Sequence, residues 1–404
     1  MFRYENGEME IYMAKNIRAL ERAGMIQPPT IPVKEERNMG VELFRVVSMI
    51  LVVMLHVLGH GGVYGRTALL SDNYKVAWFM EAFAYCSVNC YALISGYANV
   101  KSSFKFRRFF QLWLEVAFLN VGLTTVIHFL VPTAEVTTEY WIRAFFPLTA
   151  RAFWYFCAYA FMFPLIPILN KGLLSLEKWQ HALIAVLLQI PTLFRLIMQK
   201  DNYVLGSGYS CLWLICLYVI GAYFRIYGLP KWAKWWLMLP VAFGSTYVAW
   251  AFKMGIEQRV VDKVLTKQSA WYENRGILIS YISPFMTITA VALLLCFMQI
   301  KIKGKIPKLI ISNLGKATFG VFILHVGAAF WYWDEFWAKF RPYAKMETWN
   351  MVLHVLLAVL AIYLVASLIS LARIYLFKLL RVNKLIDYIA EIPSRSKAKK
   401  SQTT

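Results

Sequence analysis

Long apolar runs recur along the whole chain, and they constrain its fold more than any other feature of the sequence. A helix needs about 20 mainly apolar residues to cross a bilayer, so runs of about 18 or more are candidates. Such runs occupy residues 41–58, 76–98, 109–131, 152–169, 179–198, 211–227, 232–252, 276–299, 311–331 and 351–377. Helices and closed barrels are the structures that satisfy their backbone groups within lipid. We therefore expect an all-α, polytopic integral membrane helix bundle of about ten transmembrane helices.

The composition agrees with lipid as the solvent of much of the surface. Hydrophobic residues make up 59% of the chain and charged residues 16%, against about 45–50% and about 25% in soluble proteins. A net charge of +21 would by itself suggest nucleic-acid binding, but the Lys and Arg residues lie in short clusters between the apolar runs. Such clusters are typical of cytoplasmic loops beside anionic lipid. We expect membrane lipids as partners and no nucleic acid.

The cysteine and histidine spacings do not favour a metal site. The six Cys residues lie in apolar runs without a CxxC pair, and we interpret them as small core residues. His56 and His60 are one helical turn apart, but they lack an HExxH pattern and a clear carboxylate partner. We therefore expect no bound metal.

The distribution of charge between the runs predicts the orientation. Segments 101–108 and 301–308 are short and dense in Lys and Arg, and with ten spans both fall on the same side as the two termini. That side should be cytoplasmic. We expect a cytoplasmic N-terminal extension at 1–38, a membrane domain at 39–380 and a basic cytoplasmic tail at 381–404.

The first apolar run contains the clearest candidate site: Glu42, Arg45 and His56. Charged groups inside a membrane are costly and are functional candidates by default. Arg45 and His56 are eleven positions apart, which places them on one helix face, about 16 Å apart along the axis. Arg can hold a phosphate, and His can take a proton from a hydroxyl. A phosphorylated donor inside and a hydroxyl acceptor outside would use both. In the plainer interpretation Arg45 pairs with Glu42 and His56 bonds a neighbouring helix.

Other candidates lie on later runs, and each has a structural alternative. Ser95 and Gly96 either allow close helix packing or form a thin wall beside a donor channel. The basic residues that follow are either topology determinants or attract the phosphates of a nucleotide-like carrier: Lys101, Lys105, Arg107 and Arg108. The remaining candidates are Glu115, which should face the bundle; His325, a pocket histidine or a helix-bridging one; and Trp154, Tyr155 and Tyr159, a sugar-stacking platform or an aromatic belt.

These motifs occur in an order that resembles the membrane-bound acyltransferase family 3 over about residues 39–380. The most specific is the pair Arg45 and His56, separated by ten residues in the first helix as in that family. Segment 88–97 ends in Ser-Gly-Tyr, similar to the end of the family's second helix, although Tyr91 stands where Phe is more usual. Weaker matches lie at 154–170, 208–223, 281–284 and 320–325.

The resemblance implies ten spanning helices and O-acylation, commonly O-acetylation, of an extracytoplasmic glycan in a bacterial cell membrane. The donor it implies is cytoplasmic acetyl-CoA or another acyl-CoA, and the acceptor a glycan or lipid-linked sugar such as exopolysaccharide. It implies His56 as the base and Arg45 as a CoA-side or structural arginine. Because the chain ends soon after the tenth run, it resembles members without an esterase-like domain.

We therefore expect an acyltransferase in which the acyl group passes either directly or through an acyl-His intermediate. The expected catalytic residues are His56, Arg45 and Glu42; the expected donor-binding residues are Arg45, Ser95, Gly96, Lys101, Lys105, Arg107 and Arg108; and the expected acceptor-binding residues are His325, Trp154, Tyr155, Tyr159 and Glu115. The rival hypothesis is a transporter or flippase for a lipid-linked sugar or small anion, but we see no two related halves with discontinuous helices. A third is a scaffold or receptor without chemistry.

Overall fold

The computed structural model describes residues 37–102, 106–201 and 203–388. All regular structure in these residues is helical, which confirms the all-α prediction. The helices are α2 (Met39–Leu55), α3 (Asp72–Ala84), α4 (Ser87–Asn99), α5 (Phe106–Leu130), α6 (Thr138–Phe145), α7 (Trp154–Met162), α8 (Ile166–Ser175), α9 (Lys178–Leu187), α10 (Ile190–Met198), α11 (Cys211–Tyr227), α12 (Trp235–Val261), α13 (Ala270–Glu273), α14 (Pro284–Met298), α15 (Lys305–Val326), α16 (Ala328–Trp331), α17 (Asp334–Ala338) and α18 (Thr348–Leu379). Most of the predicted N-terminal extension and of the basic tail lies outside the described residues.

Six helical segments in the described part of the chain are long and apolar enough to cross a membrane: Met39–Arg66, Arg107–Leu130, Trp154–Ser175, Lys178–Met198, Lys305–Val326 and Thr348–Leu379. Helices α11 and α14 are apolar but shorter. The predicted span at 76–98 is divided between two helices, α3 and α4. The predicted span at 232–252 falls on α12, a long helix that contains Pro240 and a buried ion pair between Lys253 and Glu257. The chain is thus a multi-pass membrane protein, while the number of ten spans stays a prediction.

Proline residues lie where two of the spanning segments are divided into successive helices. Pro191 lies in the first turn of α10, directly after the break that separates α10 from α9. Pro164 lies in the short 3-10 turn between α7 and α8, and Pro167 lies in the first turn of α8. Proline has no N–H to donate and clashes with the preceding helical turn, so it fits the start of a new helix better than the middle of one.

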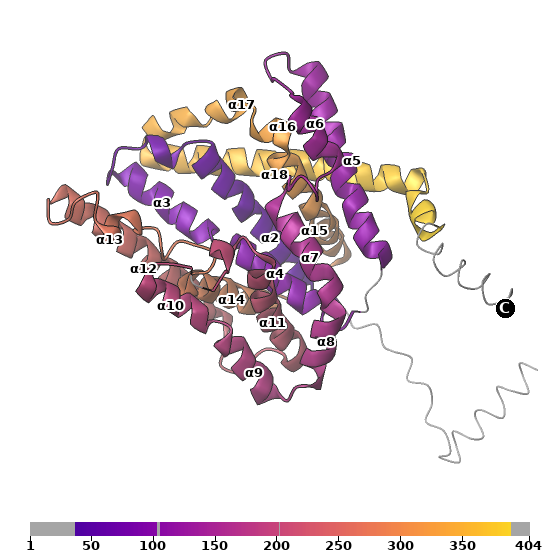
Figure 1. Cartoon of the computed structure of the whole chain (residues 1–404), viewed down its shortest axis with the longest axis horizontal. Coiled ribbons are helices and arrows are strands. Elements are labelled where there is room, and N and C mark those ends of the chain that lie inside the picture. The colour runs from indigo at the N-terminus through magenta and orange to yellow at the C-terminus, as the bar shows by residue number, and fades with distance from the viewer. Residues whose placement is uncertain (1–36, 103–105, 202, 389–404) are drawn as a thin grey trace, which may run out of the picture. The chain divides into compact units, whose positions relative to one another are not determined.

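Helix α2 lies in the middle of the bundle, where it contacts α3, α4, α14, α15 and α18 (Figure 1). Beside it, α4 packs closely on α11. A Cβ atom at Gly96 would lie 2.0 Å from the carbonyl oxygen of Tyr218, and one at Gly221 would lie 1.9 Å from that of Leu93. The two backbones can approach this closely because both positions are glycine. This contact agrees with the packing interpretation of Gly96.

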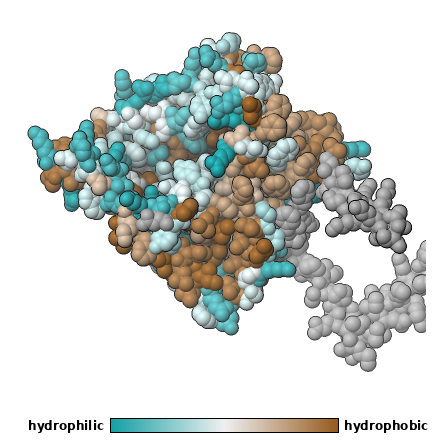
Figure 2. Space-filling model, viewed as in Figure 1, coloured by the Kyte–Doolittle hydropathy of each residue, from teal (hydrophilic) through white to brown (hydrophobic). Residues whose placement is uncertain are grey.

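The outer surface carries large apolar side chains where lipid is expected. In Figure 2 hydrophobic atoms cover the lower part of the molecule, over α8, α9 and α10, whereas hydrophilic atoms gather around α13. Trp179, Leu183 and Val186 of α9 are among the exposed residues. An exposed apolar surface of this extent is typical of a protein whose solvent is the bilayer.

Candidate active site

His56 lies where α2 changes from an α-helix to a wider π turn, residues His56–His60. The N–H of Gly61 donates to the carbonyl oxygen of His56 at 2.8 Å, five residues back. Such π turns are rare and occur frequently at functional sites. At the end of this turn, His60 Nε2 lies 2.8 Å from the carbonyl oxygen of Trp331, and the two rings stack with their centroids 3.8 Å apart.

The ring of His56 meets the ring of His325 from α15. His56 Nδ1 lies 2.9 Å from His325 Nε2, and His325 Nδ1 lies 2.6 Å from the carbonyl oxygen of Val321. A carbonyl oxygen only accepts, so His325 Nδ1 carries a proton and, in the neutral ring, its Nε2 is an acceptor. His56 Nδ1 must then be the donor. This chain of bonds leaves the lone pair of His56 Nε2 free, and within the described residues that atom has no hydrogen-bond partner.

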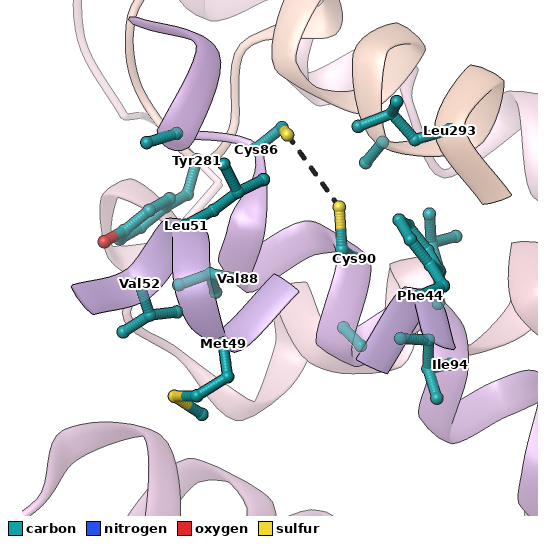
Figure 3. Packing of buried hydrophobic residues seen from close by; sticks show 14 of the residues in the cluster. Phe44, Met49, Leu51, Val52, Cys86, Val88, Cys90, Ile94, Tyr281 and Leu293 are labelled. Carbon is teal, nitrogen blue, oxygen red and sulfur yellow. Dashed lines mark hydrogen bonds between the residues drawn. The ribbon is translucent and has the colours of Figure 1, made fainter. Parts of the chain in front are cut away.

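A small apolar cavity follows α2 from His56 toward Arg45. Its volume is about 80 Å³. The positions of Met49, Val52 and His56 on α2 repeat at helical spacing, so the same face of the helix that holds Arg45 lines the cavity. Figure 3 shows Met49 and Val52 beside Val88 and Tyr281. The other lining residues are Leu55, Tyr91, Trp154, Tyr155, Phe319, Phe322 and Val326.

A second, larger cavity begins at the other side of His56. Its volume is about 380 Å³, and its lining is more polar, with Glu81, Tyr85, Arg143 and Tyr209 among the contributors. His56 lines both cavities, as do Leu55, Trp154, Tyr281 and Val326. The candidate base therefore lies between two cavities. The apolar one extends along α2 toward Arg45, and the more polar one is lined by residues such as Ala152, just before α7, and Tyr209, just before α11.

Arg45 itself is anchored on two sides. One guanidinium nitrogen lies 3.0 Å from a carboxylate oxygen of Glu42, and the hydroxyl of Tyr91 donates to the Arg45 carbonyl oxygen at 2.8 Å. The Glu42 side chain is 4% exposed and that of Arg45 20% exposed. The ion pair of the plainer interpretation is thus formed. Part of the guanidinium remains exposed at this end of α2.

The structure brings some of the predicted residues together and separates others. Trp154 and Tyr155 line the apolar cavity, whereas Tyr159 and Glu115 line neither cavity. Glu115 forms an ion pair with Arg373 of α18 instead. Of the predicted donor-binding residues, Arg107 pairs with Asp387, and Lys105 lies outside the described residues. Both Glu115 and Arg107 are thus engaged in ion pairs, and their roles in binding the acceptor and the donor stay predictions.

Sequence reasoning missed several residues of the larger cavity, above all Glu81. It is the single acidic residue in the apolar run at 76–98, which was a usable signal. Tyr85 carried no such signal, because tyrosines are common throughout the apolar runs. Tyr209 stood in the matched segment 208–223, but without an assigned role. Tyr281 stood in one of the matched segments, 281–284, but without an assigned role.

Comparison with known proteins gives one match. The family model described as "Acyltransferase domain" matches residues 38–371, most of the chain. The matched region includes Arg45, His56, Glu81 and His325. No curated protein and no solved structure matches the chain.

Proposed function

Because the chain belongs to acyltransferase family 3, a family of membrane acyltransferases, we propose that it is an O-acyltransferase. It moves an acyl group, most simply acetyl, from cytoplasmic acyl-CoA to a hydroxyl of an extracytoplasmic glycan such as exopolysaccharide or another surface sugar. The observation that carries this proposal is the free Nε2 of His56 at the border of two cavities. A base in this position can meet a donor from one side and an acceptor from the other.

The Arg45 end of α2 is the donor side in this proposal. The guanidinium has free surface there and can hold a CoA phosphate as a planar fork. Ser95 and Gly96 lie near the end of α4, directly before the basic segment that holds Lys101, Arg107 and Arg108. Clustered cations at the cytoplasmic surface raise the local concentration of a polyanionic carrier.

The chemical step uses the lone pair of His56 Nε2. The acceptor hydroxyl gives its proton to Nε2 while its oxygen attacks the thioester carbonyl carbon. The C–S bond then breaks, the new ester leaves with the acceptor, and the CoA thiolate takes the proton from the imidazolium. His325 holds His56 in the required tautomer by accepting the Nδ1–H. The alternative acyl-His route begins with attack of the same Nε2 on the thioester.

The size of the apolar cavity favours a short acyl group. Its volume of about 80 Å³ is lined by Met49, Val52, Phe322 and other closely packed side chains. A cavity needs about 10–15 Å³ of such volume to hold one water molecule, so an acetyl group fits, whereas a chain of palmitoyl length needs the surrounding side chains to move.

Ester content of surface glycans tests this function. Cells that carry the gene are compared with a deletion strain complemented by wild type, His56→Ala or His128→Ala. Alkali-labile acyl esters on extracytoplasmic glycans should disappear in the deletion and return with wild type and with His128→Ala, but not with His56→Ala. His128 is the matched control, because it is an exposed histidine of α5 that lines neither cavity. Unchanged ester content in the deletion strain would contradict the proposal and favour the transporter hypothesis.

A further inference from the structure

Glu81 carries a buried carboxyl group that has no hydrogen-bond partner among the described residues. The residue is 5% exposed, and its Oε2 atom is buried and accepts no hydrogen bond within the described residues. The carboxyls of Glu42, Glu115 and Glu257, by contrast, each have a cation beside them: Arg45, Arg373 and Lys253. Burying a carboxyl group without hydrogen bonds is costly, and the few such groups in native proteins call for an explanation.

The position of Glu81 points to a ligand as the missing partner. Glu81 lines the larger cavity together with His56. A Cβ atom built at Gly59 would lie 3.6 Å from Glu81 Oε1, so this oxygen lies beside the π turn that starts at His56. The carboxyl and the candidate base thus face one space from two helices, α3 and α2.

The walls around Glu81 define the chemistry that fits. Tyr281 packs against Tyr85 and Tyr209 with ring centroids 4.9 and 5.1 Å apart, and Trp154 lies 4.5 Å from Tyr209. Arg143 is the other charged residue of the lining, and it pairs with Glu139 at 2.6 Å. A ligand that offers hydroxyl donors to Glu81 and a ring face to the aromatic side chains satisfies both features.

We propose that Glu81 is the acceptor-binding carboxyl of this cavity: it accepts hydrogen bonds from hydroxyls adjacent to the one that is acylated, and so places the reacting hydroxyl at His56 Nε2. This inference rests on the proposed function, because it assigns the larger cavity to the acceptor. It also names a requirement of the acceptor, which must carry at least two neighbouring hydroxyls on a compact ring.

Carbodiimide labelling tests the binding role without acyl transfer. The full-length protein in detergent is treated with dicyclohexylcarbodiimide, which converts an accessible carboxyl into a stable N-acylurea, and peptide masses give the labelling rate at each carboxyl. Glu81 should be labelled, and methyl glucoside or methyl galactoside should slow its labelling several-fold. Cyclohexanol at the same concentration, a ring with one hydroxyl, should not. Asp72, an exposed acid at the start of α3, is the internal reference, whose rate the sugars should leave unchanged.

Kinetics of a matched pair of variants test the placement. In Glu81→Gln, transfer from acetyl-CoA to the methyl glycoside should show a KM for the glycoside raised about tenfold, as expected for a lost hydrogen bond to a charged group. Hydrolysis of acetyl-CoA by water should continue at the wild-type rate. Asp72→Asn, an exposed acid at the start of the same helix, should change neither.

The outcomes separate this inference from the proposed function. If the wild-type protein does not turn over acyl-CoA, the proposed function is contradicted, but protection of Glu81 by the glycosides would still show that the cavity binds sugar. Failure to label Glu81, or labelling that neither glycoside slows, would overturn the role of Glu81. If Glu81→Gln does not fold, Glu81→Asp keeps the carboxyl, and an unchanged KM in that shortened variant together with unprotected labelling would overturn it equally.

Discussion

Nδ1 of His56 lies 2.9 Å from Nε2 of His325, across a sequence separation of 269 residues. The second ring is fixed by the carbonyl oxygen of Val321, 2.6 Å from its Nδ1. The proton on His325 therefore determines which nitrogen of His56 is free. In this arrangement His56 is the candidate base and His325 orients it without touching the substrate.

Replacing His325 should lower the turnover number rather than the donor affinity. In His325→Ala the Nδ1–H of His56 loses its acceptor, and the tautomer with a free Nε2 is no longer favoured. A general base contributes about 10²–10⁴-fold, and the loss of its orienting partner should remove part of that contribution, so we expect kcat to fall by at least about tenfold. His325→Gln should retain more activity, because its amide oxygen can accept the same hydrogen. A His325→Ala enzyme with wild-type kcat would show that the contact has no catalytic role.

Replacing Arg45 should act on the donor. Removal of the guanidinium in Arg45→Ala should raise the KM for acyl-CoA by about tenfold, the value of one hydrogen bond to a charged group. Lys171→Gln, an exposed cation on α8, is the control and should leave the KM unchanged. Steady-state kinetics with acetyl-CoA provide the measurement. A lower unfolding temperature with an unchanged KM would instead assign Arg45 to the ion pair with Glu42 alone.

Adding one methyl group at Gly96 should destabilise the bundle. The new Cβ would lie 2.0 Å from the carbonyl oxygen of Tyr218, so α4 and α11 must separate. Overpacking of this kind costs about 1–3 kcal/mol. Gly122→Ala is the matched control, because nothing lies within 4 Å of a Cβ at that position of α5. Thermal unfolding in detergent should show a lower midpoint for Gly96→Ala only, and equal midpoints would contradict the close contact.

Turnover should depend on the length of the acyl chain. The apolar cavity of about 80 Å³ accepts acetyl, so acetyl-CoA should be a better substrate than palmitoyl-CoA. Phe322→Ala removes a ring from the cavity wall and should improve the relative kcat/KM for the longer chain. Equal kcat/KM values for both donors in the wild-type protein would exclude this cavity as the acyl site.

Much of the helical framework could be predicted from sequence because its signal is local. Apolar runs of membrane length predict helices without knowledge of their partners, and the eleven-residue separation of Arg45 and His56 places both on one face of a single helix. The division of the second predicted run was missed. The chain leaves the helix at Tyr85 and Cys86 with neither glycine nor proline at the break.

The composition of the site could not be predicted because its contacts are distant in the sequence. The pairing of His56 with His325 joins α2 to α15, and Glu81 reaches the cavity from α3. Periodicity shows which face of a helix is apolar, but it does not show which other helix that face meets. From the sequence, His325 could be either a pocket residue or a bridge between helices. The packing of α2 against α15 brings it to His56.

Release of free thiol from acetyl-CoA by the detergent-purified protein is the most direct test of His56 as the base. Wild type is measured beside His56→Ala and His128→Ala, with thermal unfolding to confirm that each variant is folded. We expect wild type and His128→Ala to release CoA thiol and His56→Ala to be slower by about 10²–10⁴-fold. Equal thiol release by folded wild type and His56→Ala would contradict the assignment of His56 as the catalytic base.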